Sequence, residues 1–222
     1  MQTLLSNCSL LTKLREDFGN LINLQHLDIS GTKLKKMQAQ ITTLQNLQIL
    51  SAFVISKLQY GLKVGELKKF PYLKGKLSIL KLQNVVDPSK AFQANLKKKE
   101  QIHELAFEWD YGMTEDTHIE RLLQPPINLK KMTIKFYGGT SFPNWLGDSS
   151  FGNMMCLCLS GRDRCWSLQT LGKLFSLKEL YIFGMKSIKT VGTEFNGSGS
   201  PSFQPFPCLR ILSFEGMLEW EE

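Results

Sequence analysis

One six-residue pattern of apolar positions recurs along the chain. It reads apolar, two other residues, apolar, one other residue, apolar, and its clearest copies are Leu24-x-x-Leu27-x-Ile29 and Leu177-x-x-Leu180-x-Ile182. Further copies span residues 102–107, 129–134, 154–159 and 209–214, and weaker copies span 47–52 and 77–79. The inner leucine advances by 23 residues from Leu27 to Leu50 and again from Leu157 to Leu180. Such regular recurrence indicates a chain built from structural repeats.

The alternation inside each copy predicts a short β-strand, because successive side chains of a strand point to opposite faces. One strand cannot bury its apolar face alone, so stacked copies form a parallel sheet that packs on the returning half of each repeat. The period is that of a leucine-rich repeat. The predicted fold is therefore an α/β leucine-rich-repeat solenoid, a curved horseshoe. Its short parallel strands lie on the concave face, and irregular and helical segments lie on the convex face.

We expect the chain to form a single domain over residues 1–222, with about eight to nine irregular repeats and an incomplete repeat at each end. Three stretches interrupt the rhythm and are predicted to be flexible insertions, near residues 56–74, 111–118 and 196–202. One helix is expected over residues 89–101, because it would follow the Asp87-Pro88 start signal.

The residues that alternate with the inner apolar positions point away from the core and form the candidate partner-binding surface. Leu80, Tyr181 and Phe183 are its expected anchors, because desolvated aromatic and apolar side chains dominate interface energies. The candidate positions are Asp28, Ser30, Ser78, Leu80, Glu104, Ala106, Glu108, Lys131, Thr133, Lys135, Cys156, Cys158, Ser160, Glu179, Tyr181, Phe183, Ile211, Ser213 and Glu215.

The formal net charge of +7 is distributed unevenly along the chain. Residues 57–99 hold eleven lysines against two acids, whereas residues 100–120 hold seven acids and no lysine or arginine. The basic runs at residues 68–69 and 97–99 lack the interleaved aromatic residues of a nucleic-acid surface, so we do not expect nucleic-acid binding. We interpret them as solvated surface or as a protein contact.

The sequence favours a binding module over an enzyme, and we expect no catalytic residue, cofactor or metal. Cys156, Cys158 and Cys165 supply three thiolates where zinc takes four ligands, and no histidine lies nearby to act as a base. The acids of residues 104–110 alternate along one strand and read as a solvated strand face. An odd number of cysteines without a signal sequence predicts reduced thiols and a cytoplasmic location. The longest apolar run, residues 49–55, is too short to span a membrane.

The particular residues found in the repeats identify a family more specifically than their spacing does. Residues 19–31, 75–85, 104–110, 137–146 and 191–195 together resemble the leucine-rich-repeat region of plant coiled-coil-type nucleotide-binding leucine-rich-repeat (NLR) disease-resistance proteins. The resemblance implies a protein-binding role in plant innate immunity: sensing pathogen effectors or guarded host proteins and restraining a nucleotide-binding region. The phosphate-binding motif of that region does not occur in this chain, so the resemblance implies a truncated fragment.

Two other interpretations of the sequence stay open. The chain is a non-functional or partial gene product in the first, since it shows no terminal caps. In the second, the chain is a general cytosolic repeat scaffold. That interpretation does not account for the specific sequence motifs given above.

Overall fold

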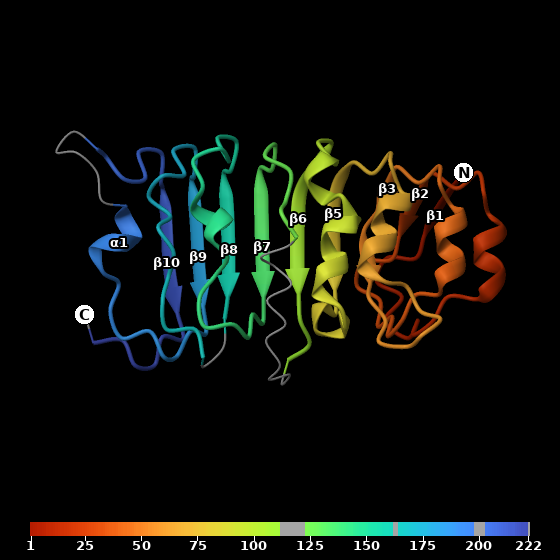
Figure 1. The fold of residues 1–222 in the computed structure, drawn as a ribbon, viewed down its shortest axis with the longest axis horizontal. Helices are drawn as coiled ribbons and strands as arrows, with labels where there is room; N and C mark the ends of the chain where they lie inside the picture. The colour runs from red at the N-terminus through yellow and green to blue at the C-terminus, as the bar shows by residue number, and fades with distance from the viewer. Residues whose placement is uncertain (112–122, 162–163, 198–202, 222) are drawn as a thin grey trace.

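The computed structural model describes residues 1–111, 123–161, 164–197 and 203–221. Its strands stand side by side along the long axis of the molecule, with the two termini at opposite ends (Figure 1). Within each of the two sheets, every described strand pairs in parallel with its neighbour in the chain, and β3 and β4 do not pair with each other. The fold is thus the predicted leucine-rich-repeat solenoid, in which each repeat adds one strand to the row.

The strands form two sheets. The first has the order β1 (Gln2–Leu4), β2 (His26–Asp28) and β3 (Ile49–Leu50). The second contains, in chain order, β4 (Ala52–Val54), β5 (Gly75–Leu80), β6 (Ile102–Glu108), β7 (Lys131–Lys135), β8 (Cys156–Ser160), β9 (Glu179–Phe183) and β10 (Ile211–Glu215).

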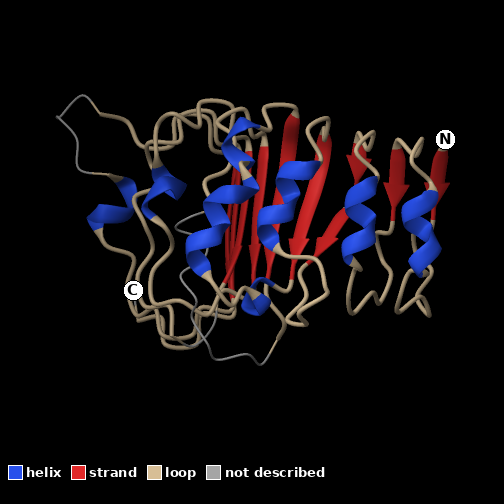
Figure 2. Cartoon of the chain, turned by 45° about the vertical axis from the view of Figure 1, so that its right-hand side comes forward, coloured by secondary structure: helices blue, strands red, loops and turns tan. Residues whose placement is uncertain are grey.

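Short helices cover one face of these sheets and leave the other face open (Figure 2). Among the described residues most are 3₁₀ helices of three to seven residues. They are η1 (Glu16–Asn20), η2 (Ala39–Thr43), η3 (Val64–Lys69), η4 (Leu82–Asn84), η5 (Pro88–Ala94), η6 (Leu96–Lys98), η8 (Asn144–Gly147) and the α-helix α1 (Thr193–Asn196). We call the helical side convex and the open side concave.

The inner apolar positions form the core, as the sequence predicts. Leu105, Met132, Leu157 and Leu180 lie in register on four successive strands, and each is at most 2% exposed. Leu212 continues the register opposite Leu180 but is 49% exposed, so the prediction that it faces a closed core is wrong. Among the described residues no strand lies beyond β10 to cover it.

The third repeat departs from the predicted pattern at Ser51. The frame over residues 47–52 placed Ala52 in the core, and Ala52 is buried at 6% exposure. Phe53, however, takes the inner position opposite Ile79 and is fully buried. Ala52 pairs with Ser78 and lies on the concave side. Because Leu50 and Phe53 both point inward, the strand must break between them. The break at Ser51 divides what the sequence predicts as one sheet into two.

The predicted helix over residues 89–101 is wrong. Two short 3₁₀ helices, η5 and η6, occupy this stretch, and Asn95 separates them with a left-handed backbone at φ 54°. The start signal works as expected: the Asp87 carboxylate accepts a hydrogen bond from the Ser89 backbone N–H at 3.1 Å.

The structure describes the three predicted insertions to different extents. Residues 56–74 include η3 and bury Leu62, Leu67 and Phe70 in the common core. Residues 112–118 of the second insertion and 198–202 of the third lie outside the described residues.

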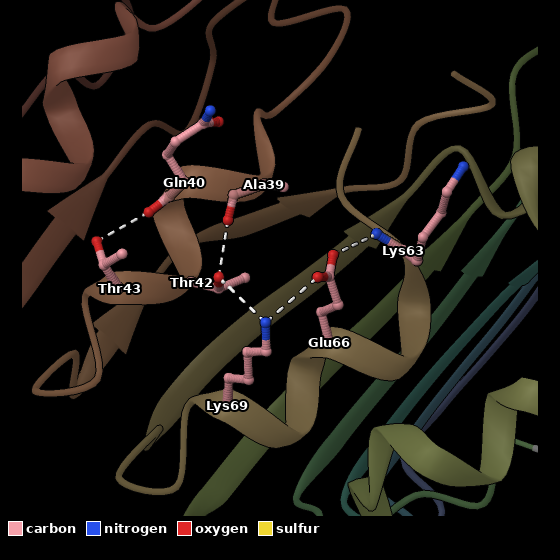
Figure 3. A network of polar contacts seen from close by, with 7 residues as sticks. All are labelled: Ala39, Gln40, Thr42, Thr43, Lys63, Glu66 and Lys69. Atoms are coloured by element: carbon pink, nitrogen blue, oxygen red, sulfur yellow. Dashed lines mark hydrogen bonds and ion pairs between the residues drawn. The ribbon is translucent and has the colours of Figure 1, made fainter. Parts of the chain in front are cut away.

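Polar contacts on the convex side join η2 to η3 (Figure 3). The Lys69 ammonium lies 3.4 Å from the Thr42 hydroxyl and 3.5 Å from the Glu66 carboxylate. The Glu66 carboxylate also accepts a hydrogen bond from the Lys63 backbone N–H at 3.0 Å, which caps η3. These bonds span the level of the strand break, so the two sheets stay joined through the convex layer.

Lys99 corrects the interpretation of the basic run. Lys97 and Lys98 are exposed on η6, but Lys99 is only 7% exposed, and its ammonium donates a 2.6 Å hydrogen bond to the Phe70 carbonyl oxygen. Burial lowers the pKa of Lys99 to about 8. Only the first two lysines of the run can therefore contribute to a solvated basic surface.

The buried amine predicts a pH-dependent stability. Between about pH 8 and pH 10.5 the unfolded chain holds a proton on Lys99 that the folded chain has lost, so folding becomes more favourable as pH rises through this window. We expect the free energy of unfolding to gain about 1–2 kcal/mol relative to the Lys99→Met variant across the window, after allowance for partial solvent screening. Urea denaturation of both proteins at pH 7, 8.5 and 10 measures it. Parallel pH profiles would contradict this account of Lys99.

Candidate protein-interaction surface

The nineteen predicted surface positions all lie on, or directly beside, the concave face. None of them is buried: each is half-buried or exposed. They come from β2, from β5 to β10 and, for Ser30, from the turn after β2. Their positions follow the alternation of the strands, and their use as a partner-binding surface stays a prediction.

Parallel register arranges these side chains in three rows across the strands. A central row of mostly small, uncharged residues crosses from β4 to β10. It consists of Ala52, Ser78, Ala106, Thr133, Cys158, Tyr181 and Ser213. A row nearer the amino ends of the strands contains Lys76, Glu104, Lys131, Cys156, Glu179 and Ile211, and one nearer the carboxyl ends contains Val54, Leu80, Glu108, Lys135, Ser160, Phe183 and Glu215.

The face is hollowed over β5 to β9, where a depression of about 520 Å³ lies between the two outer rows. Charges on its rim alternate in sign from strand to strand. The Lys135 ammonium lies 3.5 Å from the Glu108 carboxylate, a partly exposed pair of little consequence for stability. Alternating charge of this kind sets the register of a partner more than the strength of its binding.

An aromatic pair closes one end of the depression. The rings of Tyr181 and Phe183 lie parallel, with centroids 6.2 Å apart and planes within 4°. The Tyr181 hydroxyl donates a hydrogen bond to the Glu179 carboxylate at 3.4 Å, which fixes the ring. Both side chains are half-buried, so a partner that covers them gains apolar contact at low conformational cost.

The concave cysteines have the properties of inert thiols. Burial raises the pKa of Cys156 to about 11 and also raises the pKa of Cys158, so both thiols are protonated at neutral pH. Nucleophilic attack and metal ligation both require the thiolate. Across the described ranges, no group of three or more histidine, cysteine or acidic side chains is arranged to hold a metal ion.

A second and larger hollow, of about 1080 Å³, lies at the strand break between the two sheets. We call it the junction hollow. Sequence reasoning missed several of its lining residues, among them His26, Lys76 and Val54. The signal was present for His26 and Lys76, since each continues the outward alternation by two residues from Asp28 and Ser78. Val54 could not be placed without knowing of the break.

No helix in the described part of the chain is long and apolar enough to cross a membrane.

Comparison with known protein families places most of the chain in a family of leucine-rich repeats. The model described as R13L1/DRL21 LRRs matches residues 64–185, more than half of the chain. The matched segment begins at η3 and ends just after β9, so it covers the depression and its aromatic end.

Curated relatives are plant disease-resistance proteins. The chain is 37% identical over 178 residues to the disease resistance RPP13-like protein 1 of Arabidopsis thaliana, which covers 73% of this chain and 17% of that protein. It is 39% identical over 191 residues to a second disease resistance protein of the same plant, covering 80% of this chain and 13% of the relative. Disease resistance protein RGA1 of Solanum bulbocastanum is 31% identical over 185 residues, with 82% and 19% covered. The chain thus spans less than a fifth of each relative's length.

Among solved structures, a leucine-rich-repeat protein of Leptospira interrogans aligns with 93% of this chain and 57% of its own, at 18% identity and a TM-score of 0.39.

Proposed function

Because the chain belongs to the R13L1/DRL21 leucine-rich-repeat family, we propose that its concave face recognises a protein in plant defence, either a pathogen effector or a host protein guarded against one. The chain is a leucine-rich-repeat module of the type found in plant disease-resistance proteins. Repeat modules of this kind are protein-interaction surfaces and not enzymes. Recognition by this particular chain goes beyond that family membership and is the content of the proposal.

The observation that carries the proposal is the open face of the seven-stranded sheet. It presents half-buried side chains around a depression of about 520 Å³, with the Tyr181–Phe183 stack at one end. Aromatic anchors surrounded by polar and charged residues are typical of interface hot spots. We also propose a cytoplasmic site of action. All five cysteines are free thiols, which supports this location.

The test is direct binding to purified candidate effectors and host proteins, measured by isothermal titration calorimetry. Replacing Tyr181 and Phe183 with alanine should weaken the binding of a genuine partner at least tenfold, since each truncation of a buried aromatic anchor costs about 1 kcal/mol or more of binding free energy. Phe92→Ala is the matched control, because Phe92 is 68% exposed on the convex helix η5. Equal affinities of the double variant and the control would contradict the proposal.

We further propose that the chain contacts the nucleotide-binding region of a full-length relative and restrains it. The uneven charge supports this idea, since residues 57–99 sum to +9 (eleven lysines less two acids) and present Lys97 and Lys98 on η6. A field of one sign steers an oppositely charged surface and is screened beyond about 8 Å at physiological salt.

Supplying that region in trans tests the restraint. We expect salt-sensitive association that weakens when Lys97 and Lys98 are changed to Glu; Lys99 is left unchanged because it is buried. If the affinity of association changed with neither salt concentration nor charge reversal, the uneven charge of residues 57–99 would have no role in this contact.

A further inference from the structure

The junction hollow lies where the strand alternation is irregular at Ser51, between β3 and β4. β3 bonds to β2, β4 bonds to β5, and Ser51 lies between them. The Ser51 hydroxyl oxygen accepts a hydrogen bond from the Ile29 N–H at 2.8 Å, and the Val54 N–H is directed at the Met37 sulfur at 3.3 Å. The backbone of Ser51 still bridges the sheets, since its N–H donates to the Leu27 carbonyl oxygen at 3.2 Å and its carbonyl oxygen accepts from the Ser78 N–H at 3.1 Å. The hollow of about 1080 Å³ lies at this bridge. That is at the upper end of the size of small-molecule sites.

The two ends of the junction hollow differ in chemistry. Because all the strands are parallel, their amino ends share one edge. That edge contributes His26, Lys74, Lys76 and His103 to the lining, while Glu104 lies opposite Lys76 on β6, outside the lining. The amino end of the hollow is thus set up to receive negative charge.

The opposite end is apolar. Leu34 and Val54 are buried there, at 7% and 1% exposure, and Leu80 is half-buried. Glu108 also lines this end, but its carboxylate is engaged by Lys135 at 3.5 Å.

Asp28, the other carboxylate in the lining, lies between the two ends and is held in place locally. It accepts hydrogen bonds from the Ser30 N–H at 3.0 Å and the Ser30 hydroxyl at 2.7 Å, and the backbone bond is the main reason that its pKa is lowered. The Lys76 charge adds to this lowering.

We propose that the junction hollow binds an extended segment of a protein partner that carries acidic residues at one end and apolar residues at the other. The acids meet Lys74, Lys76 and the two imidazoles, while the apolar side chains pack against Leu80, which is half-buried in the free chain. This inference rests on the proposed function, because it names the segment that a recognised protein offers to the concave face.

The dimensions fit such a segment. β5 is six residues long, so the hollow follows the strands for about 20 Å, the length of about six extended residues. Burial of the apolar side chains supplies most of the affinity, and the cationic end fixes the direction in which the segment lies. A charged end and an apolar end are both required, which excludes a purely ionic or a purely apolar ligand.

Three six-residue peptides, each blocked at both termini, are the probes. The matched peptide is Glu-Glu-Ser-Leu-Ser-Leu, the charge-inverted one is Lys-Lys-Ser-Leu-Ser-Leu, and the one without apolar residues is Glu-Glu-Ser-Ser-Ser-Ser. Each is titrated into ¹⁵N-labelled full chain and followed by amide chemical shifts. We expect saturable submillimolar binding of the matched peptide, with shifts confined to residues 26–30, 49–54 and 74–80, and at least tenfold weaker binding of the other two.

The charge-reversed variant Lys74→Glu with Lys76→Glu should bind the matched peptide at least tenfold less tightly than the natural chain. Lys13→Glu with Lys173→Glu, two exposed positions outside the hollow, makes the same change in net charge and should bind it normally. Both lysines of the hollow are exposed, and circular dichroism checks that each variant remains folded.

Two results would overturn the inference: no saturable binding of the matched peptide at millimolar concentration, or equal binding of all three peptides. The experiments distinguish a failure of the junction-hollow inference from a failure of the proposed function. If a genuine partner still depends on Tyr181 and Phe183 while the matched peptide does not bind, the junction hollow is not a site but the concave face still recognises protein. Specific peptide binding without any dependence of partners on the aromatic pair supports the hollow and contradicts the wider proposal.

Discussion

Replacing Leu157 with alanine is expected to lower the free energy of unfolding by about 2–5 kcal/mol, the range for removing a leucine from a closed core. Leu157 is fully buried on β8, in register with Met132 and Leu180 on the flanking strands. Neighbours held on both sides by a backbone ladder cannot collapse into the cavity, so most of its cost remains.

The adjacent residue provides the matched control. Cys158 is half-buried on the concave side of the same strand, and Cys158→Ser should change stability by less than about 1 kcal/mol. Urea denaturation followed by circular dichroism gives both values. Similar losses in the two variants would mean that the two faces of the sheet are not distinguished as described.

Replacing Gly147 with alanine is expected to cost about 1–3 kcal/mol, although it adds a single methyl group. Gly147 ends η8 on the convex side, and a Cβ there would collide with the backbone carbonyl oxygen of Thr170 in the next repeat. Gly172 meets the carbonyl oxygen of Asn196 in the same way one repeat later. Backbone cannot move aside as a side-chain end can, so the repeats must separate.

Gly152→Ala is the control for this prediction, because no heavy atom lies within 4 Å of the added Cβ and the residue does not have a positive φ. It should be neutral or stabilise the chain by up to about 1 kcal/mol, through the lower entropy of the unfolded state. Thermal melting of the two variants under identical conditions gives the comparison. A Gly147→Ala protein as stable as the control would show that successive convex segments are not packed this closely.

The strands were predictable because one physical rule governs them. An apolar pair such as Leu157 and Leu159 must point inward wherever one side of a sheet is buried, so alternation alone located both the core and the concave surface positions. The same rule failed at Ser51, because the frame over residues 47–52 assumes unbroken alternation from Leu50 to Ala52, whereas the inward positions shift to Leu50 and Phe53. Phe53 lies opposite Ile79 of the next repeat, a contact that the local pattern does not show.

The convex side was less predictable because its contacts are made between repeats. The expected helix over residues 89–101 is divided at Asn95, where the chain turns with a left-handed backbone. Lys99 resembles a surface lysine in sequence, and only the Phe70 carbonyl oxygen 29 residues away explains its burial. The junction hollow likewise lies where the two sheets meet, so no local pattern of residues predicts it.

Recognition through the concave face is the central claim, and hydroxyl-radical footprinting tests it most directly. The chain is oxidised alone and in the presence of a saturating protein partner, and modification is measured at individual side chains. The account predicts protection of Leu80, Tyr181 and Phe183 on the concave face, with no change at Phe92 and Tyr60, which are 68% and 84% exposed and line neither of the two hollows. Protection confined to Phe92 and Tyr60, with unchanged oxidation of Tyr181 and Phe183, would contradict it.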